Sequence, residues 1–183
     1  MRIPIYHMEI SEANGPGKRI VIWVQGCKHH CYHCFNPETH AFKTDNLIDT
    51  DAIIKKINQQ QGVCGVTFSG GEPLEYPLAI SEIIREINPE LSTILYSGYT
   101  LEEVLSDQDK TMVIRQCDLS ILGRYNDTLP HPYMGKKFIC TTQRIDLDYF
   151  KTLNNIEYHI QKNHITKSGI FKTNQYGIQA TIG

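Results

Sequence analysis

Three cysteines lie within eight residues of one another and form the most reactive group in the chain. They follow the spacing Cys27-Lys-His-His-Cys31-Tyr-His-Cys34. A short loop can wrap three thiolates at this spacing around one metal centre. Because a closed electron-transfer cluster generally has four protein ligands, three would leave one iron of a [4Fe–4S] cube open to a substrate or cofactor.

Zinc is the rival metal, in a Cys₃His site that a neighbouring histidine completes. The candidates for this fourth ligand are His29, His30, His33 and His40. Inert buried thiols are a third interpretation, and the close spacing of the cysteines speaks against it. The spacing favours iron–sulfur over zinc. Without a role at the metal, we expect His29 and His30 to be solvated loop residues.

The composition limits the class of protein. The chain has 183 residues, 40% of them hydrophobic and 21% charged, and a net charge of −2. This length corresponds to about one domain, and the composition excludes a disordered tail or a collagen-like rod. No basic run stands out, so the usual charge pattern of a nucleic-acid binder is missing. The longest strongly apolar run, Ile20 to Val24, is far too short to cross a membrane, and the start lacks a signal peptide's apolar region. We expect a cytoplasmic protein with reduced cysteines.

Strand and helix patterns alternate along the chain. β-branched and aromatic residues predict strands over 19–24, 63–68, 92–96 and 118–122. Helical spacing of isoleucines predicts helices between Thr50 and Gly62 and over 77–87, and Thr100 with Glu103 predicts a capping box for another helix. Short alternations after residue 156 predict antiparallel strands or a hairpin. Cys64 and Cys117, within or beside strands, should be small buried hydrophobes.

Glycine-bearing loops follow the predicted strands, and two of these loops carry a family resemblance. Cys-x3-Cys-x2-Cys after a strand is similar to the signature of the radical S-adenosylmethionine (SAM) superfamily. Ser69-Gly70-Gly71-Glu72-Pro73, after the next strand, looks like its SAM-binding loop. More closely, the chain resembles the activating proteins of anaerobic ribonucleotide reductase. The matching stretches keep the family's order and comprise residues 14–19, 24–27, 34–39, 96–100 and 122–125.

The resemblance implies a radical SAM oxidoreductase that works anaerobically and activates a glycyl-radical enzyme. Cys27, Cys31 and Cys34 would hold the [4Fe–4S] cluster, and SAM would chelate the open iron. Reductive cleavage of SAM would give methionine and a 5′-deoxyadenosyl radical, which takes a hydrogen from a backbone glycine of the partner. The implied partners are a glycyl-radical enzyme, such as anaerobic ribonucleotide reductase, and an electron donor such as flavodoxin or ferredoxin, with no nucleic acid or membrane involved.

The resemblance also implies the residues that contact SAM. Glycines let the backbone come close to a ligand, and a carboxylate can accept hydrogen bonds from an ammonium group. The implied contacts are Gly70, Gly71 and Glu72 at the methionyl end of SAM, His33 and Phe35 beside the adenine, and Ser97 and Tyr99 lining the same cavity.

The chain departs from the family in two places. The family usually has Pro-Gly before the third cysteine, where this chain has Tyr32-His33. Its Arg-Gly-Ser…Asn-Gln segment corresponds here to residues 134–136 and 141–144, with Met134 in place of the arginine. The chain also continues past Arg144, where the family normally stops. These departures leave the SAM chemistry intact and keep the substrate open, so the runner-up is a radical SAM enzyme that acts directly on a small molecule or peptide. A third hypothesis, from another class, is a non-catalytic zinc or iron–sulfur module.

The repeated strand–loop–helix order predicts a parallel α/β sheet with its site where the strands end. A full (β/α)₈ barrel needs about 250 residues, which is more than this chain has. We therefore expect a partial (β/α) barrel of the radical SAM type with a short C-terminal β extension. It would form a single domain over 1–183, with a core over about 1–125 and a divergent segment over about 126–183.

Overall fold

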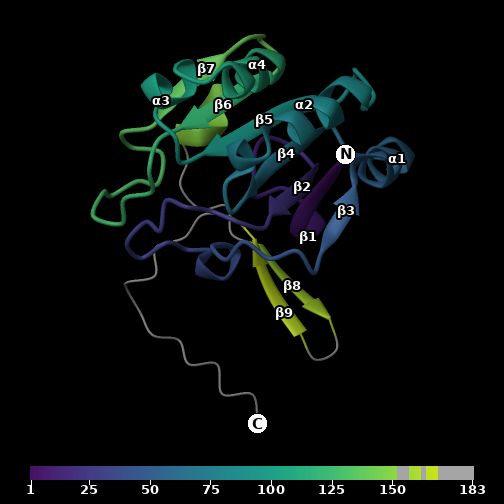
Figure 1. Cartoon of the computed structure of the whole chain (residues 1–183), viewed down its shortest axis with the longest axis horizontal. Helices are drawn as coiled ribbons and strands as arrows, with labels where there is room; N and C mark the ends of the chain where they lie inside the picture. Colours follow the sequence, from purple (N-terminus) through teal and green to yellow (C-terminus); the bar gives the residue numbers. More distant parts are fainter. Residues whose placement is uncertain (152–156, 162–163, 169–183) are drawn as a thin grey trace.

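The computed structural model describes residues 1–151, 157–161 and 164–168. Its main feature is a seven-stranded sheet (Figure 1). In spatial order the strands are β3 (Leu47–Asp49), β1 (Arg2–Ser11), β2 (Arg19–Val24), β4 (Gly65–Gly70), β5 (Ser92–Ser97), β6 (Leu119–Leu122) and β7 (Lys137–Cys140). The pairs from β2 through β6 are parallel, and β1, β3 and β7 run antiparallel to their neighbours.

The four predicted parallel strands are confirmed within a mixed α/β fold, and the sheet they form is open. The sequence did not predict the three antiparallel strands β1, β3 and β7, which flank the parallel strands. β1 contains Pro4, and a proline within an apolar run counts against a strand. In the structure Pro4 lies in β1, between β3 and β2, and its register partner is Leu47 of the three-residue strand β3.

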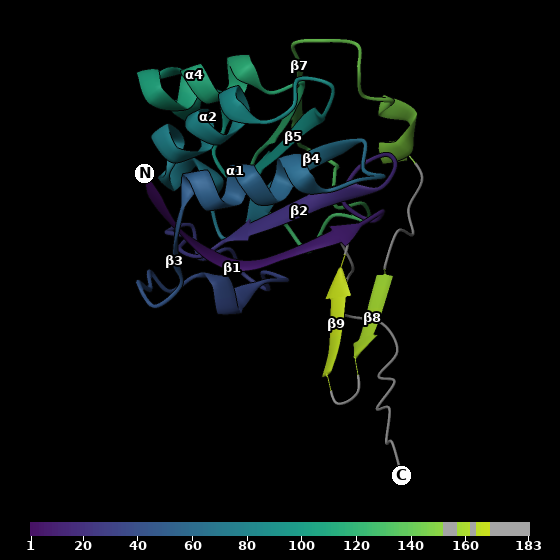
Figure 2. The same cartoon turned by 90° about the vertical axis from the view of Figure 1, so that its right-hand side faces the viewer.

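Helices α1 (Thr50–Gln59), α2 (Pro77–Glu86) and α4 (Gln108–Gln116) lie together over one face of the sheet (Figure 2). The apolar stripe of α2 explains its packing, because Ile80 and Ile83 are fully buried and each such burial is worth about 1.5–3 kcal/mol. The predicted capping box of Thr100 and Glu103 begins α3 (Leu101–Leu105). Sequence periodicity missed α4, which buries only Val113 and Ile114. The short 3₁₀ helices are Pro37–Thr39, Pro73–Glu75 and Leu147–Lys151.

The apolar core has two parts. The larger lies between the sheet and the helices, and a smaller cluster joins Ile94, Leu119 and Ile121 of the sheet to Ile145 and Phe150. Cys117 is fully buried, as predicted, but the prediction that Cys64 is buried is wrong. Cys64 lies just before β4 begins, beyond the covered part of the sheet.

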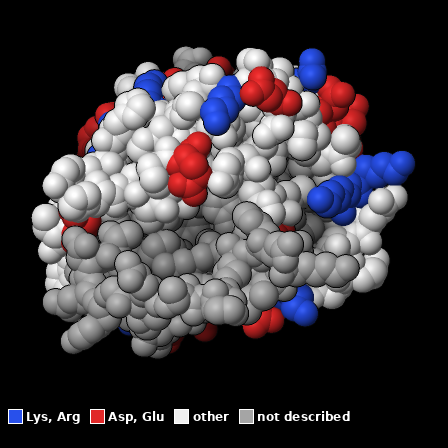
Figure 3. Space-filling model, turned by 90° about the horizontal axis from the view of Figure 1, so that it is seen from below, with Lys and Arg blue, Asp and Glu red and all other residues white. Residues whose placement is uncertain are grey.

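The C-terminal region contains the predicted hairpin, formed by β8 (Glu157–Gln161) and β9 (His164–Ser168) as a separate antiparallel pair. The alternations at 170–171 and 178–182 lie outside the described residues. Within the described ranges, no helix has the length and apolar character needed to cross a membrane. On the face seen in Figure 3, acidic and basic side chains of the described residues are scattered and mixed in sign.

Candidate active site

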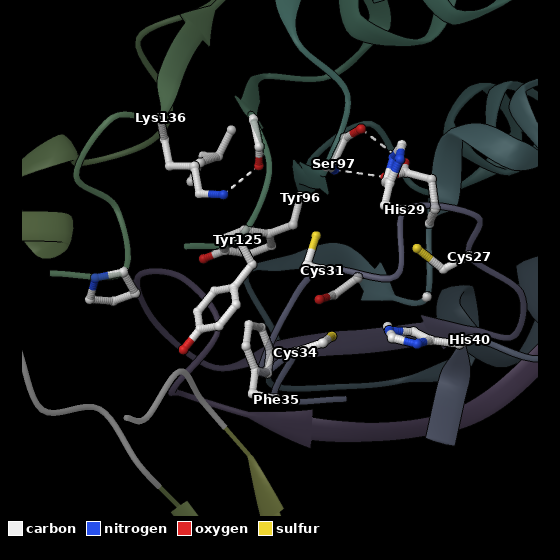
Figure 4. A pocket seen from close by; sticks show the side chains of 18 of the residues that line it. Cys27, His29, Cys31, Cys34, Phe35, His40, Tyr96, Ser97, Tyr125 and Lys136 are labelled. Carbon is white, nitrogen blue, oxygen red and sulfur yellow. Dashed lines mark hydrogen bonds and ion pairs between the residues drawn. The ribbon is translucent and has the colours of Figure 1, made fainter. Parts of the chain in front are cut away.

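One cavity lies where the parallel strands end, as the α/β pattern predicted (Figure 4). Loops after β2, β4, β5 and β6 contribute to its wall, together with the segment that leads to β7. The lining residues are Cys27, His29, Cys31, Cys34, Phe35, His40, Ser69, Gly70, Gly71, Glu72, Tyr96, Ser97, Gly98, Ile121, Gly123, Tyr125, Pro132, Tyr133 and Lys136.

All three predicted metal-binding cysteines line this cavity as free thiols. Cys27 is buried, and Cys31 and Cys34 are half-buried. Burial raises the pKa of the Cys27 thiol to about 11 and also raises the pKa of Cys34, because a buried thiolate loses its hydration. The metal-free thiols of Cys27 and Cys34 therefore hold their protons at neutral pH, and a metal that binds them must displace those protons.

Backbone hydrogen bonds fix the start of the cysteine loop. The Gly26 N–H donates to Thr39 O at 2.8 Å, and the Cys27 N–H donates to His40 O at 3.0 Å. Gly26 has φ +106°, and a Cβ there would lie 2.4 Å from the Tyr76 hydroxyl. Only glycine fits this turn, so the first cysteine enters the cavity from a constrained position.

The donor set fits a [4Fe–4S] cluster with three protein ligands. Among the described residues, no three His, Cys, Asp or Glu side chains converge on a point that one metal ion could occupy. The cysteines of a cubane bind different irons, and the three free thiols that line this cavity are the donors that such a cluster takes.

The Glu72 carboxylate is fully buried and accepts four hydrogen bonds from the protein. Its Oε1 accepts from Leu74 N and Ser97 Oγ, both at 2.9 Å. Its Oε2 accepts from Gly98 N at 2.7 Å and from His29 Nε2 at 3.1 Å. A carboxylate has about four lone-pair positions, so the protein itself satisfies this group completely.

The two predicted glycines line the cavity and also permit close packing of the strand ends. Gly70 has φ +99°, and a Cβ there would lie 2.6 Å from Trp23 Cα. At Gly71 a Cβ would lie 2.4 Å from Gly26 O. The loop after β4 can therefore pass directly against the cysteine loop, which leaves its backbone at the cavity wall.

Two of the remaining predicted contacts reach the cavity. Phe35 lines it and packs edge-to-face on Tyr125, with ring centroids 5.1 Å apart. Ser97 lines it as well, although its hydroxyl donates to Glu72. Both placements agree with a wall for a bound cofactor.

The other two predicted contacts, His33 and Tyr99, are not among the residues that line the cavity. Nδ1 of His33 lies 2.5 Å from Asp127 Oδ2, and its ring stacks on Tyr32 at 3.8 Å. The Tyr99 hydroxyl donates to Glu75 at 2.6 Å, and this bond and burial raise the tyrosine's pKa. The roles of His33 and Tyr99 at SAM stay predictions.

The surroundings of two cavity residues differ from those that the sequence predicts. The expectation that His29 is solvated is wrong, because its side chain is only 4% exposed. Because Lys136 is next to Lys137 in the sequence, the two lysines are expected to form a solvated pair. Instead, the Lys136 Nζ donates to Gly123 O and, at 2.5 Å, to Arg124 O. Burial lowers the pKa of Lys136 to about 8. No local sequence pattern indicates the surroundings of either residue. Lys136 reaches the site because the chain returns into β7.

Comparison with known proteins decides the family. Residues 13–145 match the 4Fe-4S single cluster domain family. The anaerobic ribonucleoside-triphosphate reductase-activating protein of Enterobacteria phage T4 is 30% identical over 125 residues, which cover 64% of this chain and 77% of that protein. The chain belongs to this radical SAM family of activating proteins.

Two further relatives agree with this assignment. The activating protein of the same name from Vibrio cholerae is 26% identical over 136 residues, covering 66% of this chain and 83% of the relative. The pyruvate formate-lyase-activating enzyme of Clostridium pasteurianum is 30% identical over 110 residues, covering 55% of this chain and 46% of that enzyme. The shared part therefore spans under half of the latter enzyme.

The structure explains one departure from the activating-protein family. His33 occupies the position before the third cysteine where the family usually has glycine, and its φ is +50°. Glycine adopts this left-handed conformation most easily, and histidine is among the side chains found there more often than average. The backbone conformation of the cysteine loop is thus one that suits the family's usual glycine.

The second departure is divided between the two edges of the sheet, because Lys136 lines the cavity while residues 141–144 lie away from it. Thr142 Oγ1 donates to Asp118 Oδ1 at 2.6 Å, and Arg144 Nη1 lies 3.4 Å from Asp118 Oδ2. Asp118 immediately precedes β6, at the edge where the parallel strands start. Residues 141–144 therefore secure the sheet, while Met134 stands exposed near the opposite edge.

Proposed function

We propose that this protein uses a [4Fe–4S] cluster and SAM to install a glycyl radical on a partner enzyme such as anaerobic ribonucleotide reductase. The observation that carries the proposal is the meeting of three free thiols and the Gly70-Gly71-Glu72 loop at one cavity. Family membership supports it, because relatives are named for activating anaerobic ribonucleoside-triphosphate reductase and pyruvate formate-lyase.

In this proposal Cys27, Cys31 and Cys34 would hold the cluster, which leaves one iron without a protein ligand. When bound, the cluster and SAM supply one-electron chemistry that ends with methionine, 5′-deoxyadenosine and a radical on the partner's glycine. A one-electron donor such as flavodoxin or ferredoxin completes the electron balance. The glycine's lost hydrogen atom is the one that 5′-deoxyadenosine gains.

The chain's own residues shape the space around SAM. The backbone at Gly70 and Gly71 lies at the cavity wall and can approach the methionyl end. The ring of Phe35 supplies an apolar face for the adenine, and the loop containing Ser97 closes the wall beside it. In this proposal His33 lies beside the adenine and Tyr99 lines the same cavity, as the family resemblance implies. A partial barrel with an open side suits a substrate as large as a protein loop.

Anaerobic reconstitution tests the cofactor first. The wild-type chain should take up about four iron and become brown. Cys31→Ala should fail to retain the cluster. Stoichiometric zinc without iron uptake would contradict the proposal at this stage.

The radical transfer is tested with anaerobic ribonucleotide reductase as the partner. Dithionite and SAM should yield 5′-deoxyadenosine together with a doublet electron paramagnetic resonance signal in the reductase. The splitting of the doublet comes from the hydrogen that remains on the glycine Cα. The doublet should therefore collapse to a singlet when the reductase carries glycine deuterated at Cα. SAM cleavage coupled only to a small-molecule product, with no signal in the reductase, would refute the activase function and favour the small-molecule enzyme.

A further inference from the structure

Glu72 joins the three loops that meet at the cavity. Its donors Ser97 and Gly98 belong to the end of β5 and the loop after it, and Leu74 lies in its own loop after β4. His29 is its one donor from the cysteine loop. The contact suits a hydrogen bond that His29 Nε2–H donates to a Glu72 carboxylate oxygen.

The His29 ring is held on several sides. Its side chain is 4% exposed, and its ring packs edge-to-face on Tyr99 with centroids 4.5 Å apart. Gly98 leaves room for it, since a Cβ at that position would lie 2.4 Å from His29 Cδ2. Figure 4 shows His29 beside Ser97 at the cavity wall, on the same side as Cys27. The ring is therefore buried and closely surrounded. In the sequence, His29 lies between the proposed cluster ligands Cys27 and Cys31.

Other side-chain ion pairs of the cysteine loop are more exposed. Lys28 Nζ lies 3.3 Å from Glu75 with its side chain 57% exposed, and the His33 side chain, paired with Asp127, is 42% exposed. Exposed ion pairs contribute little to stability because water screens them. The hydrogen bond between His29 and Glu72 is buried at both ends, so its loss leaves a buried acceptor without its donor.

We propose that His29 is a positioning residue that ties the cysteine loop to the ends of β4 and β5 through Glu72. It holds the thiols at the cavity before the cluster forms. This inference rests on the proposed function, because it takes the cysteines to be the cluster ligands. It assigns the Glu72 carboxylate a structural task within the protein, in addition to any contact that its loop makes with SAM.

The first test uses the metal-free full-length chain and trypsin, which can cut after Lys28 inside the cysteine loop. Removing the tether in His29→Ala should raise the cleavage rate at Lys28 about tenfold, since a buried hydrogen bond to a charged group is lost. His29→Gln, whose amide can donate to Glu72, should return the rate to within about threefold of wild type.

Two controls separate loop release from general unfolding. His30→Ala changes the adjacent residue, whose ring contacts His40, and should leave cleavage at Lys28 unchanged. Cleavage at Lys55 and Lys56 within α1 should stay at the wild-type rate in every variant. Equal cleavage of wild type and His29→Ala at Lys28 would overturn the inference, as would a failure of His29→Gln to restore protection.

The second test uses the reconstituted protein. His29→Ala should lose iron to a chelator about tenfold faster than wild type, and SAM should shift its electron paramagnetic resonance spectrum differently from wild type. His29→Gln should restore both properties. If wild type holds four iron and cleaves SAM while His29→Ala retains iron equally well, the inference fails and the proposed function stands. If wild type takes up no iron, the proposed function fails, and the metal-free proteolysis still decides whether His29 holds the loop.

Discussion

The two edges of the parallel sheet use buried charged residues in different ways. At the edge where the strands start, Arg19 is fully buried and donates to Thr67 Oγ1, Ser92 Oγ and the carbonyls of Val66 and Ser92 at 2.7–2.9 Å. At the edge where they end, Glu72 gathers hydrogen bonds from three loops. Arg19 joins strands to strands, while Glu72 joins loops to loops.

The difference shows how one sheet can divide stability from chemistry. At the starting edge, Asp118 accepts hydrogen bonds from the backbone and hydroxyl of Thr93 and from the Thr142 hydroxyl. At the ending edge, the strands run into glycine loops, which leave three thiols and Lys136 at a cavity wall. Changes at the starting edge should therefore cost folding energy, and changes to the thiols at the ending edge should cost cofactor binding.

The largest expected effect is the loss of Arg19. Arg19→Met leaves several buried acceptors without their donor and should lower the free energy of unfolding by about 3 kcal/mol or more. Urea unfolding of the metal-free protein measures it. Arg85→Met, at an exposed position of α2, should change stability by less than about 0.5 kcal/mol. A small effect of Arg19→Met would remove the contrast between the edges.

Gly98→Ala should have the next largest effect. The new Cβ would meet the His29 ring, and such overpacking costs about 1–3 kcal/mol. Combining it with His29→Ala removes the clash, so the double variant should be destabilised by less than the sum of the two single variants. Additive losses in a double-mutant cycle would show that Gly98 and His29 do not interact through this contact.

A pair of cysteine substitutions compares the core with the cavity. Cys117→Ala removes a fully buried thiol and should cost about 1 kcal/mol while iron uptake stays normal. Cys31→Ala, at a half-buried thiol, should change metal-free stability by less than about 0.5 kcal/mol and abolish cluster retention. Thermal unfolding and iron analysis of both variants measure these effects. Normal iron uptake by Cys31→Ala, with lost iron uptake in Cys117→Ala, would contradict the assignment of Cys31 to the cluster and Cys117 to the core.

The smallest expected effect is at His33. His33→Gly relieves a left-handed backbone that favours glycine, and it also loses a partly exposed pair with Asp127. These contributions oppose each other, so the free energy of unfolding should change by less than about 0.5 kcal/mol. A loss well above this would mean that the pair with Asp127 holds the cysteine loop more strongly than an exposed contact should.

Much of the framework could be read from the sequence because its signals are local. The strand preceding Cys27, the isoleucine stripes of α1 and α2 and the capping box at Thr100 depend on neighbours along the chain. The α4 helix was missed because few of its residues are apolar. The strand β1 was hidden by Pro4, whose pairing with Leu47 of β3 depends on residues far away in the chain.

The sequence by itself determined the chemistry that is available, because three cysteines at this spacing and a Gly-Gly-Glu loop after a strand are fixed by covalent order. Only the tertiary structure decided which side chains serve that chemistry. Cys64 is exposed, His29 is buried against Glu72, and Lys136 reaches the cavity through the antiparallel return of β7. Burial and hydrogen bonding depend on partners far away in the chain, and no local pattern records those partners.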